Sequence, residues 1–182
     1  METNEPEKVN FTTDDKVKIS ANFWKGGNEA VLLIHMLNAR KESYNIFAEK
    51  LNKAGFTVLA LDMRGHGESL EQNGLKKNWE QFNEQDFRNM ILDQKAANEF
   101  LIKEGVQLKT IVGASIGANN ALNYASINPG IENVILLSPG LDYRGVTTEE
   151  AAKRVRARTI IVASEEDAYA YGSSKALNEI LA

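Results

Sequence analysis

Short, continuously apolar runs alternate with amphipathic segments along this chain. Continuous apolar runs of this length are typical of strands buried on both faces of a sheet, whereas apolar residues spaced three to four apart are typical of helices. The runs predict strands at 30–34, 56–61, 108–112, 134–137 and 159–163, and the periodic segments predict helices at 44–51, 87–101, 116–127, 148–155 and 172–181. Alternating strands and helices form parallel units with right-handed crossovers, so an α/β fold with a doubly wound, mostly parallel sheet is expected.

The first strands are predicted to form a β-hairpin. Residues 9–11 and 17–19 alternate apolar and polar side chains around Asp14-Asp15, a pair typical of turns. Residues 68–82 are polar and irregular, and they are expected to form a loop or a minimal cap. The whole chain, residues 1–182, is interpreted as a single domain.

Composition narrows the classes of function. The 182 residues are 43% hydrophobic, which suits one compact core, and the formal net charge is −4. The one basic cluster (Lys153, Arg154, Arg156 and Arg158) is interpreted as a solvated helix face, so nucleic acid is not an expected partner. No apolar run approaches the roughly 20 residues that span a bilayer, and residues 1–10 lack a signal-peptide core. A cytoplasmic protein without a membrane partner is therefore expected.

Neither a metal nor an organic cofactor is expected. The chain has no cysteine, which excludes disulfides and thiolate metal sites. No group of histidine and carboxylate residues has the spacing of metal ligands. The dinucleotide-binding pattern G-x-G-x-x-G is also absent.

A candidate nucleophile lies between a predicted strand and a predicted helix. Residues 113–117 read Gly-Ala-Ser-Ile-Gly and fit the pattern G-x-S-x-G. In this setting the serine occupies a strained turn, and Gly113 and Gly117 avoid collisions with neighbouring backbone. The helix N-terminus offers N–H groups to a developing oxyanion. We interpret Ser115 as a nucleophile, the alternative being a tight turn without chemistry.

Together with other segments, this turn gives the chain a resemblance to the α/β-hydrolase superfamily, in particular to compact bacterial esterase- or lipase-like serine hydrolases. Residues 33–37 are similar to the family's oxyanion segment, although Met36 stands where glycine is usual. Residues 62–69 are similar to its D-x-R-G-x-G-x-S loop, and residues 161–167 to the strand that delivers the catalytic acid. The resemblance extends from Phe11 to the C-terminus.

The resemblance implies a role for each matched residue. Ser115 would be the nucleophile, and the backbone N–H groups of Leu37 and Ile116 would bind the oxyanion. Asp167 would be the acid that orients a histidine. Asp142, which follows the preceding strand, is the alternative acid.

The base that a catalytic serine requires is missing from its usual place. In this superfamily the chain order is serine, acid, histidine, but residues 168–182 contain no histidine. His35 and His66 lie upstream of Ser115, and both are predicted to be structural. The resemblance implies a further strand and helix with the histidine between them, so we expect the chain to be truncated before them. Strand 159–163 would then be an unprotected sheet edge, through which a homodimer is expected.

The leading hypothesis is a serine esterase that acts on small or short-chain acyl substrates through an acyl-enzyme at Ser115. The alternative is a catalytically incomplete hydrolase-like fragment or a ligand-binding protein, because the histidine is absent. A third hypothesis is that a partner chain supplies the histidine.

Overall fold

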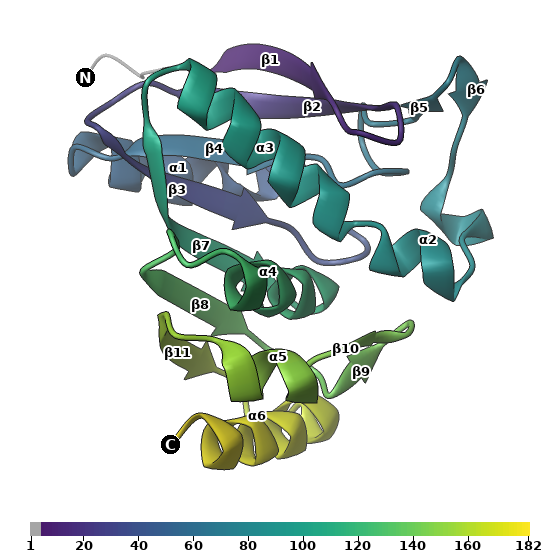
Figure 1. Ribbon diagram of the computed structural model, residues 1–182, viewed down its shortest axis with the longest axis vertical. Coiled ribbons are helices and arrows are strands. Elements are labelled where there is room, and N and C mark those ends of the chain that lie inside the picture. Colours follow the sequence, from purple (N-terminus) through teal and green to yellow (C-terminus); the bar gives the residue numbers. More distant parts are fainter. Residues whose placement is uncertain (1–4) are drawn as a thin grey trace.

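One mixed sheet with helices on both faces forms the described part of the computed structural model, residues 5–182 (Figure 1). Residues 1–4 of the polar N-terminal segment lie outside the described residues. The strand order is β11-β8-β7-β3-β4-β2-β5-β6, with β1 paired to β2, and β9 and β10 form a separate hairpin. The strands are β1 (Glu7–Thr12), β2 (Val17–Trp24), β3 (Glu29–Ile34), β4 (Thr57–Leu61), β5 (Glu71–Gln72), β6 (Leu75–Lys76), β7 (Gln107–Ala114), β8 (Asn133–Leu137), β9 (Asp142–Tyr143), β10 (Val146–Thr147) and β11 (Arg158–Val162).

The directions of the strands confirm the predicted fold class. β3, β4, β7, β8 and β11 pair in parallel, and β1 and β2 form the predicted antiparallel hairpin around Asp14-Asp15. β2 also pairs antiparallel with β4, so the hairpin extends the parallel sheet on one side. The result is a doubly wound, mostly parallel sheet with an N-terminal β-hairpin.

The helices divide unequally between the two faces of the sheet. They are η1 (Lys41–Tyr44), α1 (Asn45–Lys53), η2 (Trp79–Gln81), α2 (Glu84–Arg88), α3 (Ile91–Lys103), α4 (Ile116–Ile127), α5 (Glu149–Arg154) and α6 (Ala168–Leu181). α1 packs on one face, and α3, α4, α5 and α6 contribute to the apolar cluster on the other face (Figure 1).

The central strands are apolar on both sides because both faces are covered. In β3, Leu32 and Ile34 contribute to the cluster beneath α3 and α4, whereas Val31 and Leu33 contribute to the cluster beneath α1. Since successive side chains of a strand point to opposite faces, the continuous apolar run of β3 supplies both clusters.

Two helix boundaries differ from the sequence prediction. The segment predicted as one helix at 87–101 is divided into α2 and α3. The N–H groups of Leu92 and Asp93 bond to carbonyls three residues earlier, so the helical path is interrupted there. The last helix begins at Ala168 instead of Gly172, because the Asp167 carboxylate accepts a hydrogen bond from the Ala170 N–H and caps it.

Two polar segments contain short elements that lack a strong sequence pattern. Residues 68–82, expected to form a loop or minimal cap, contain the hairpin β5–β6 and the 3-10 turn η2. The hairpin β9–β10 follows β8 and was not predicted. In the described part of the chain, no helix has the length and apolarity needed to cross a membrane.

Candidate active site

Ser115 occupies a sharp turn between β7 and α4. Its backbone has φ 52° and ψ −122°, a left-handed conformation that costs a non-glycine residue about 1–3 kcal/mol. Its N–H donates to the Leu137 carbonyl over 2.8 Å, which ties the turn to the end of β8. A Cβ at Gly113 would lie 2.2 Å from the Gly117 carbonyl oxygen, so the turn can close only with glycine there. The strained serine therefore has the backbone geometry of a nucleophile elbow.

The first turn of α4 lies directly against the end of β3. A Cβ at Gly117 would lie 2.5 Å from the His35 carbonyl oxygen and 2.6 Å from the Ile34 carbonyl oxygen. This close approach brings the start of α4 to the segment that carries Leu37. Within residues 5–182, neither the Leu37 N–H nor the Ile116 N–H donates a hydrogen bond, so both are available to an oxyanion.

Met36 does not prevent residues 35–39, the segment that the resemblance predicts to bind the oxyanion and that is here called the oxyanion loop, from turning. The Ala39 N–H donates to the Met36 carbonyl over 3.0 Å and closes a turn through Leu37. Met36 has no positive φ, and its side chain is 47% exposed. A side chain at this position therefore points outward instead of distorting the loop.

His35 is fixed by backbone groups on both sides of its ring. It is 1% exposed, its Nδ1 bonds the Met36 carbonyl over 2.7 Å, and its Nε2 accepts from the Met63 N–H over 3.0 Å. Burial, with a smaller contribution from His66, lowers the pKa of His35 to about 4, although the Met36 carbonyl opposes that shift. The ring is therefore neutral at pH 7 with both nitrogens engaged, and it joins the oxyanion loop to the end of β4.

His66 is also enclosed. It is 3% exposed, stacks on Trp79 with ring centroids 5.4 Å apart, and bonds the Arg64 carbonyl through Nδ1 over 2.9 Å. Burial lowers its pKa, while the carbonyls of Arg64 and Leu37 oppose that shift. Its Nε2 is buried without a partner among the described residues. Neither histidine of the chain hydrogen-bonds Ser115 in this structure.

The far end of the oxyanion loop is held by a buried ion pair. Lys41 is 1% exposed, and its Nζ lies 2.7 Å from Asp62 Oδ2 and 2.7 Å from Glu68 Oε2. The Lys41 N–H also donates to Asp62 Oδ1 over 2.8 Å. Burial by itself lowers the pKa of Lys41, but the hydrogen bonds to Asp62 and Glu68 raise it by more. The pKa is therefore above its usual value, and the ammonium stays charged. This pair fastens the start of η1 to the end of β4.

The acid candidates lie on two neighbouring segments. Asp167 follows β11 and is exposed, and one of its oxygens caps α6 by accepting from the Ala170 N–H over 3.0 Å. Asp142 opens the hairpin β9–β10 and accepts from the Gly145 N–H over 2.7 Å, which closes the hairpin turn. Both carboxylates thus have local backbone partners, and the second oxygen of Asp167 accepts no hydrogen bond from another described residue.

Tyr143 is a site residue that the sequence did not indicate. Its hydroxyl donates to the Ser138 carbonyl over 3.3 Å, and the same oxygen is placed to accept a hydrogen bond from the Ser115 side chain. Burial raises the pKa of Tyr143, the bond with Ser115 lowers it, and the charge of Asp167 raises it, with a net increase. Tyr143 is therefore protonated at neutral pH, and because its one hydrogen is donated to the Ser138 carbonyl, its oxygen acts toward Ser115 as a hydrogen-bond acceptor.

Two anchors hold the hairpin that carries Tyr143. The buried Asn119 of α4 donates to the Val146 carbonyl over 2.7 Å and accepts from the Gly140 N–H over 3.0 Å. From α6, the Tyr169 hydroxyl donates to the Asp142 carbonyl over 2.7 Å and accepts from the Asp142 N–H over 3.0 Å. Because both backbone groups of Asp142 bond one phenol, Tyr143 is held in place next to Ser115.

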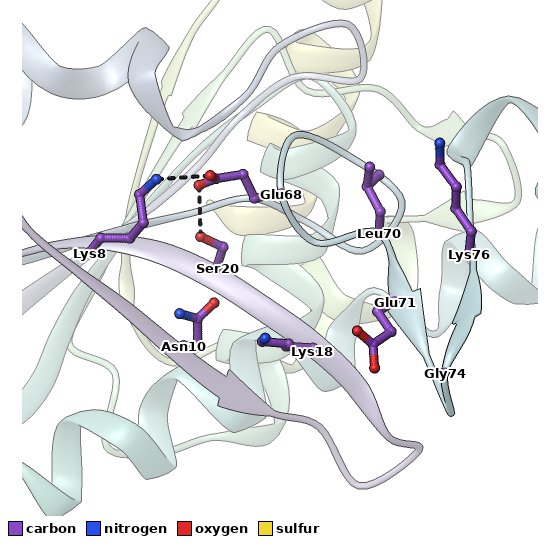
Figure 2. A pocket seen from close by; sticks show the side chains of 9 residues that line it. All are labelled: Lys8, Asn10, Lys18, Ser20, Glu68, Leu70, Glu71, Gly74 and Lys76. Atoms are coloured by element: carbon purple, nitrogen blue, oxygen red, sulfur yellow. Dashed lines mark hydrogen bonds and ion pairs between the residues drawn. The ribbon is translucent and has the colours of Figure 1, made fainter.

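A cavity of ≈ 530 Å³ lies elsewhere, on the outer antiparallel strands (Figure 2). Its lining residues come from β1, β2 and residues 68–76. Across it, Lys8 bonds Glu68 over 2.8 Å, and the Ser20 hydroxyl donates to the same carboxylate. No element of the Ser115 turn contributes to this cavity, so it is not part of the candidate active site. Among residues 5–182, no group of three or more histidine and carboxylate side chains could hold a metal ion.

A strained serine between a parallel strand and a helix, in a doubly wound sheet, defines a serine-hydrolase-type protein of the α/β-hydrolase superfamily. The family described as serine aminopeptidase, S33, matches residues 27–166, and the chain belongs to this family.

Solved structures of low sequence identity share this fold. An esterase from Pyrococcus furiosus has a TM-score of 0.81 at 20% identity, covering 97% of this chain and 77% of that one. A dienelactone hydrolase from Anabaena variabilis has a TM-score of 0.74 at 21% identity, covering 97% and 82%. A thermostable carboxyl esterase from Bacillus coagulans has a TM-score of 0.61 at 20% identity, covering 74% and 44%. No curated protein sequence matches the chain.

Proposed function

We propose that this chain is a serine hydrolase that cleaves carboxylic esters with small or short-chain acyl groups through an acyl-enzyme at Ser115. The observation that carries the proposal is the strained Ser115 backbone beside two N–H groups, of Leu37 and Ile116, that have no partner in residues 5–182. The names of two structural relatives, an esterase and a carboxyl esterase, agree with an ester substrate.

The proposed reaction has two steps. Ser115 Oγ attacks the ester carbonyl carbon, and the Leu37 and Ile116 N–H groups stabilise the oxyanion that forms. The bond between the acyl carbon and the leaving oxygen then breaks, so that an alkoxide or phenolate leaves and the acyl group stays on Ser115. The serine proton passes to the leaving group or to solvent. Water adds to the acyl-enzyme and releases the carboxylic acid, which restores the Ser115 hydroxyl.

The positions of the two histidines indicate which leaving groups the proposed reaction favours. His35 has both nitrogens bonded to backbone, and His66 is buried against Trp79, so neither is placed to carry the serine proton. An oxyanion hole and binding alone still give about 10³–10⁴ over water in a serine protease. Esters whose leaving group needs no protonation, such as aryl esters, should therefore react best with this chain.

Acylation by 4-nitrophenyl acetate tests this proposal directly. We expect a burst of one nitrophenolate per chain, and an intact mass that increases by one acetyl group located at Ser115. Ser115→Ala should show neither the burst nor the added mass, and Ser126→Ala, at another partly buried serine outside the elbow, should behave like the wild type. Equal acetylation of wild type and Ser115→Ala would overturn the proposal.

The second candidate function is ligand binding without catalysis, and the enclosed histidines favour it. It predicts a folded protein in which Ser115 is never acylated. In that case the wild type would resemble Ser115→Ala in the burst experiment, while its far-UV circular dichroism would match a mixed α/β fold.

Removal of the Tyr143 hydroxyl should slow the acylation. We expect Tyr143→Phe to lower the rate of acyl-enzyme formation by about tenfold, the value of one hydrogen bond of about 1.4 kcal/mol that orients the Ser115 hydroxyl. Tyr171→Phe is the matched control, because its hydroxyl bonds the exposed Glu165 and not Ser115. A faster reaction in Tyr143→Phe would mean that Tyr143 restrains Ser115 instead of assisting it.

A further inference from the structure

Among residues 5–182, β11 forms one edge of the sheet, and no strand pairs with its outward backbone groups. The Arg158 N–H donates to the Glu132 carbonyl over 2.9 Å, and the Val162 carbonyl accepts from the Ser138 N–H over 2.7 Å, so these residues direct their backbone groups toward β8. Backbone groups alternate in direction along a strand. Those of Thr159 and Ile161 therefore point away from β8, where no strand in residues 5–182 pairs with them.

A groove of ≈ 400 Å³ follows this edge between β11 and α6. It is lined by Ile161, Ala163, Tyr171, Ser174, Lys175, Asn178 and Glu179. Ser174 is 8% exposed, and its Oγ is buried with no hydrogen-bond partner among the described residues. A buried hydroxyl without a partner is destabilising. A chain that adds to the edge could supply both this hydroxyl and the free backbone groups with partners.

One face of β11 is also apolar and uncovered. Ile160 is 43% exposed and Val162 is 53% exposed, although both are large aliphatic side chains. In the parallel register they lie beside Ile135 and Leu137 of β8, which pack only partly into the cluster beneath α1. The four side chains form an apolar strip, here called the β11 strip, next to the unpaired edge. Apolar edges without protection are prone to pair with another chain.

The charges at the two ends of β11 indicate which chain fits. Arg156 and Arg158 are exposed at its start, and Glu165 and Glu166 are exposed beyond its end. None of these four forms an ion pair with another described residue. An antiparallel pairing of two identical strands places the basic end of one copy beside the acidic end of the other. A parallel pairing would place like charges together.

We propose that β11 pairs antiparallel with β11 of a second copy about a two-fold axis near Ile160. The sheet would then continue across the dimer, the two β11 strips would meet, and the arginine pair of each copy would face the glutamate pair of its partner. Such an interface is self-complementary, as two-fold symmetry requires. It adds no base to Ser115, because His35 and His66 are buried in each copy. The inference is independent of the proposed function.

Charge reversal distinguishes this antiparallel pairing from non-specific association. Sedimentation velocity over a wide range of protein concentrations should show a monomer–dimer equilibrium for the wild type. Arg156→Glu with Arg158→Glu, and separately Glu165→Arg with Glu166→Arg, should each weaken the homodimer by at least about tenfold. An equimolar mixture of the two double variants should dimerise again, because both ends of a mixed antiparallel pair then carry opposite charges.

A control variant and a hydrogen-exchange measurement test the same interface. Lys18→Glu with Lys76→Glu makes the same change in net charge as the double arginine variant, on exposed residues near the opposite end of the sheet, and it should dimerise like the wild type. Hydrogen exchange should slow at the Thr159 and Ile161 amides as the concentration rises. A wild type that is monomeric at all concentrations, double variants that still dimerise, or a mixture that stays monomeric would each overturn the proposal.

Discussion

Replacement of Lys41 by methionine should lower the free energy of unfolding by about 3–5 kcal/mol, the usual result of leaving a buried charge without its partner. The Lys41 Nζ is the only cation that an ion pair places within 4.0 Å of the Asp62 carboxylate among the described residues, and Asp62 is 0% exposed. Methionine has a similar length, so the packing is nearly preserved while the ammonium is lost. Urea denaturation at pH 7 followed by circular dichroism measures the difference.

A lysine of the same chain provides the control for this substitution. Lys50 is exposed on α1 and forms no ion pair with another described residue, so Lys50→Met should change the stability by less than about 0.5 kcal/mol. If Lys41→Met were as stable as Lys50→Met, the ion pair with Asp62 and Glu68 would not hold the start of η1 to β4.

The same pair connects stability with the candidate site. The segment with the Leu37 N–H is fixed at one end by the bond from the Met63 N–H to His35 Nε2, and at the other by Lys41 and Asp62. Both attachments are made to the residues that directly follow β4. The position of the oxyanion loop therefore depends on the D-x-R-G-x-G-x-S segment, although none of its side chains hydrogen-bonds Ser115 in this structure.

Residues with strong local signals were placed well from the sequence. The predicted helix 116–127 coincides with α4, because Ser115 and its glycines fix where β7 ends and the helix begins. The strands that are buried on both faces were found from continuous apolar runs, such as 30–34 in β3. In each case the local pattern and the tertiary environment favour the same structure.

The sequence did not indicate the residues whose role depends on partners far away in the chain. Lys41 lies among polar residues, and its burial results from carboxylates 21 and 27 positions later. Tyr143 lies on a hairpin with strands of two residues each, and its position next to Ser115 depends on Asn119 and Tyr169. No local period or motif encodes such contacts, so only the assembled fold reveals them.

Acidification should unfold the protein partly through His35. Its pKa is about 4 in the folded chain and about 6.5 when exposed, so the unfolded chain binds a proton at a higher pH than the folded chain does. The contribution of neutral His35 to the free energy of unfolding is complete above pH 6.5. It declines as the pH falls from 6.5 to 4, by about 3 kcal/mol in total. The lowered pKa of His66 acts in the same direction. Asp93, whose pKa burial raises to about 6 against the opposing effect of Arg64, acts in the opposite direction.

His35→Gln separates this effect from the other titrating groups. Glutamine keeps one acceptor and one donor for the Met63 N–H and the Met36 carbonyl, but it does not bind a proton. Urea unfolding at pH 7.5 and at pH 4.5 should show a larger loss of stability in the wild type than in His35→Gln, by about 2–3 kcal/mol. Equal losses would mean that His35 does not resist protonation. Because protonation also removes the Nε2 acceptor of the Met63 N–H, acylation of Ser115 should decline over the same pH range, and in His35→Gln that decline should be smaller.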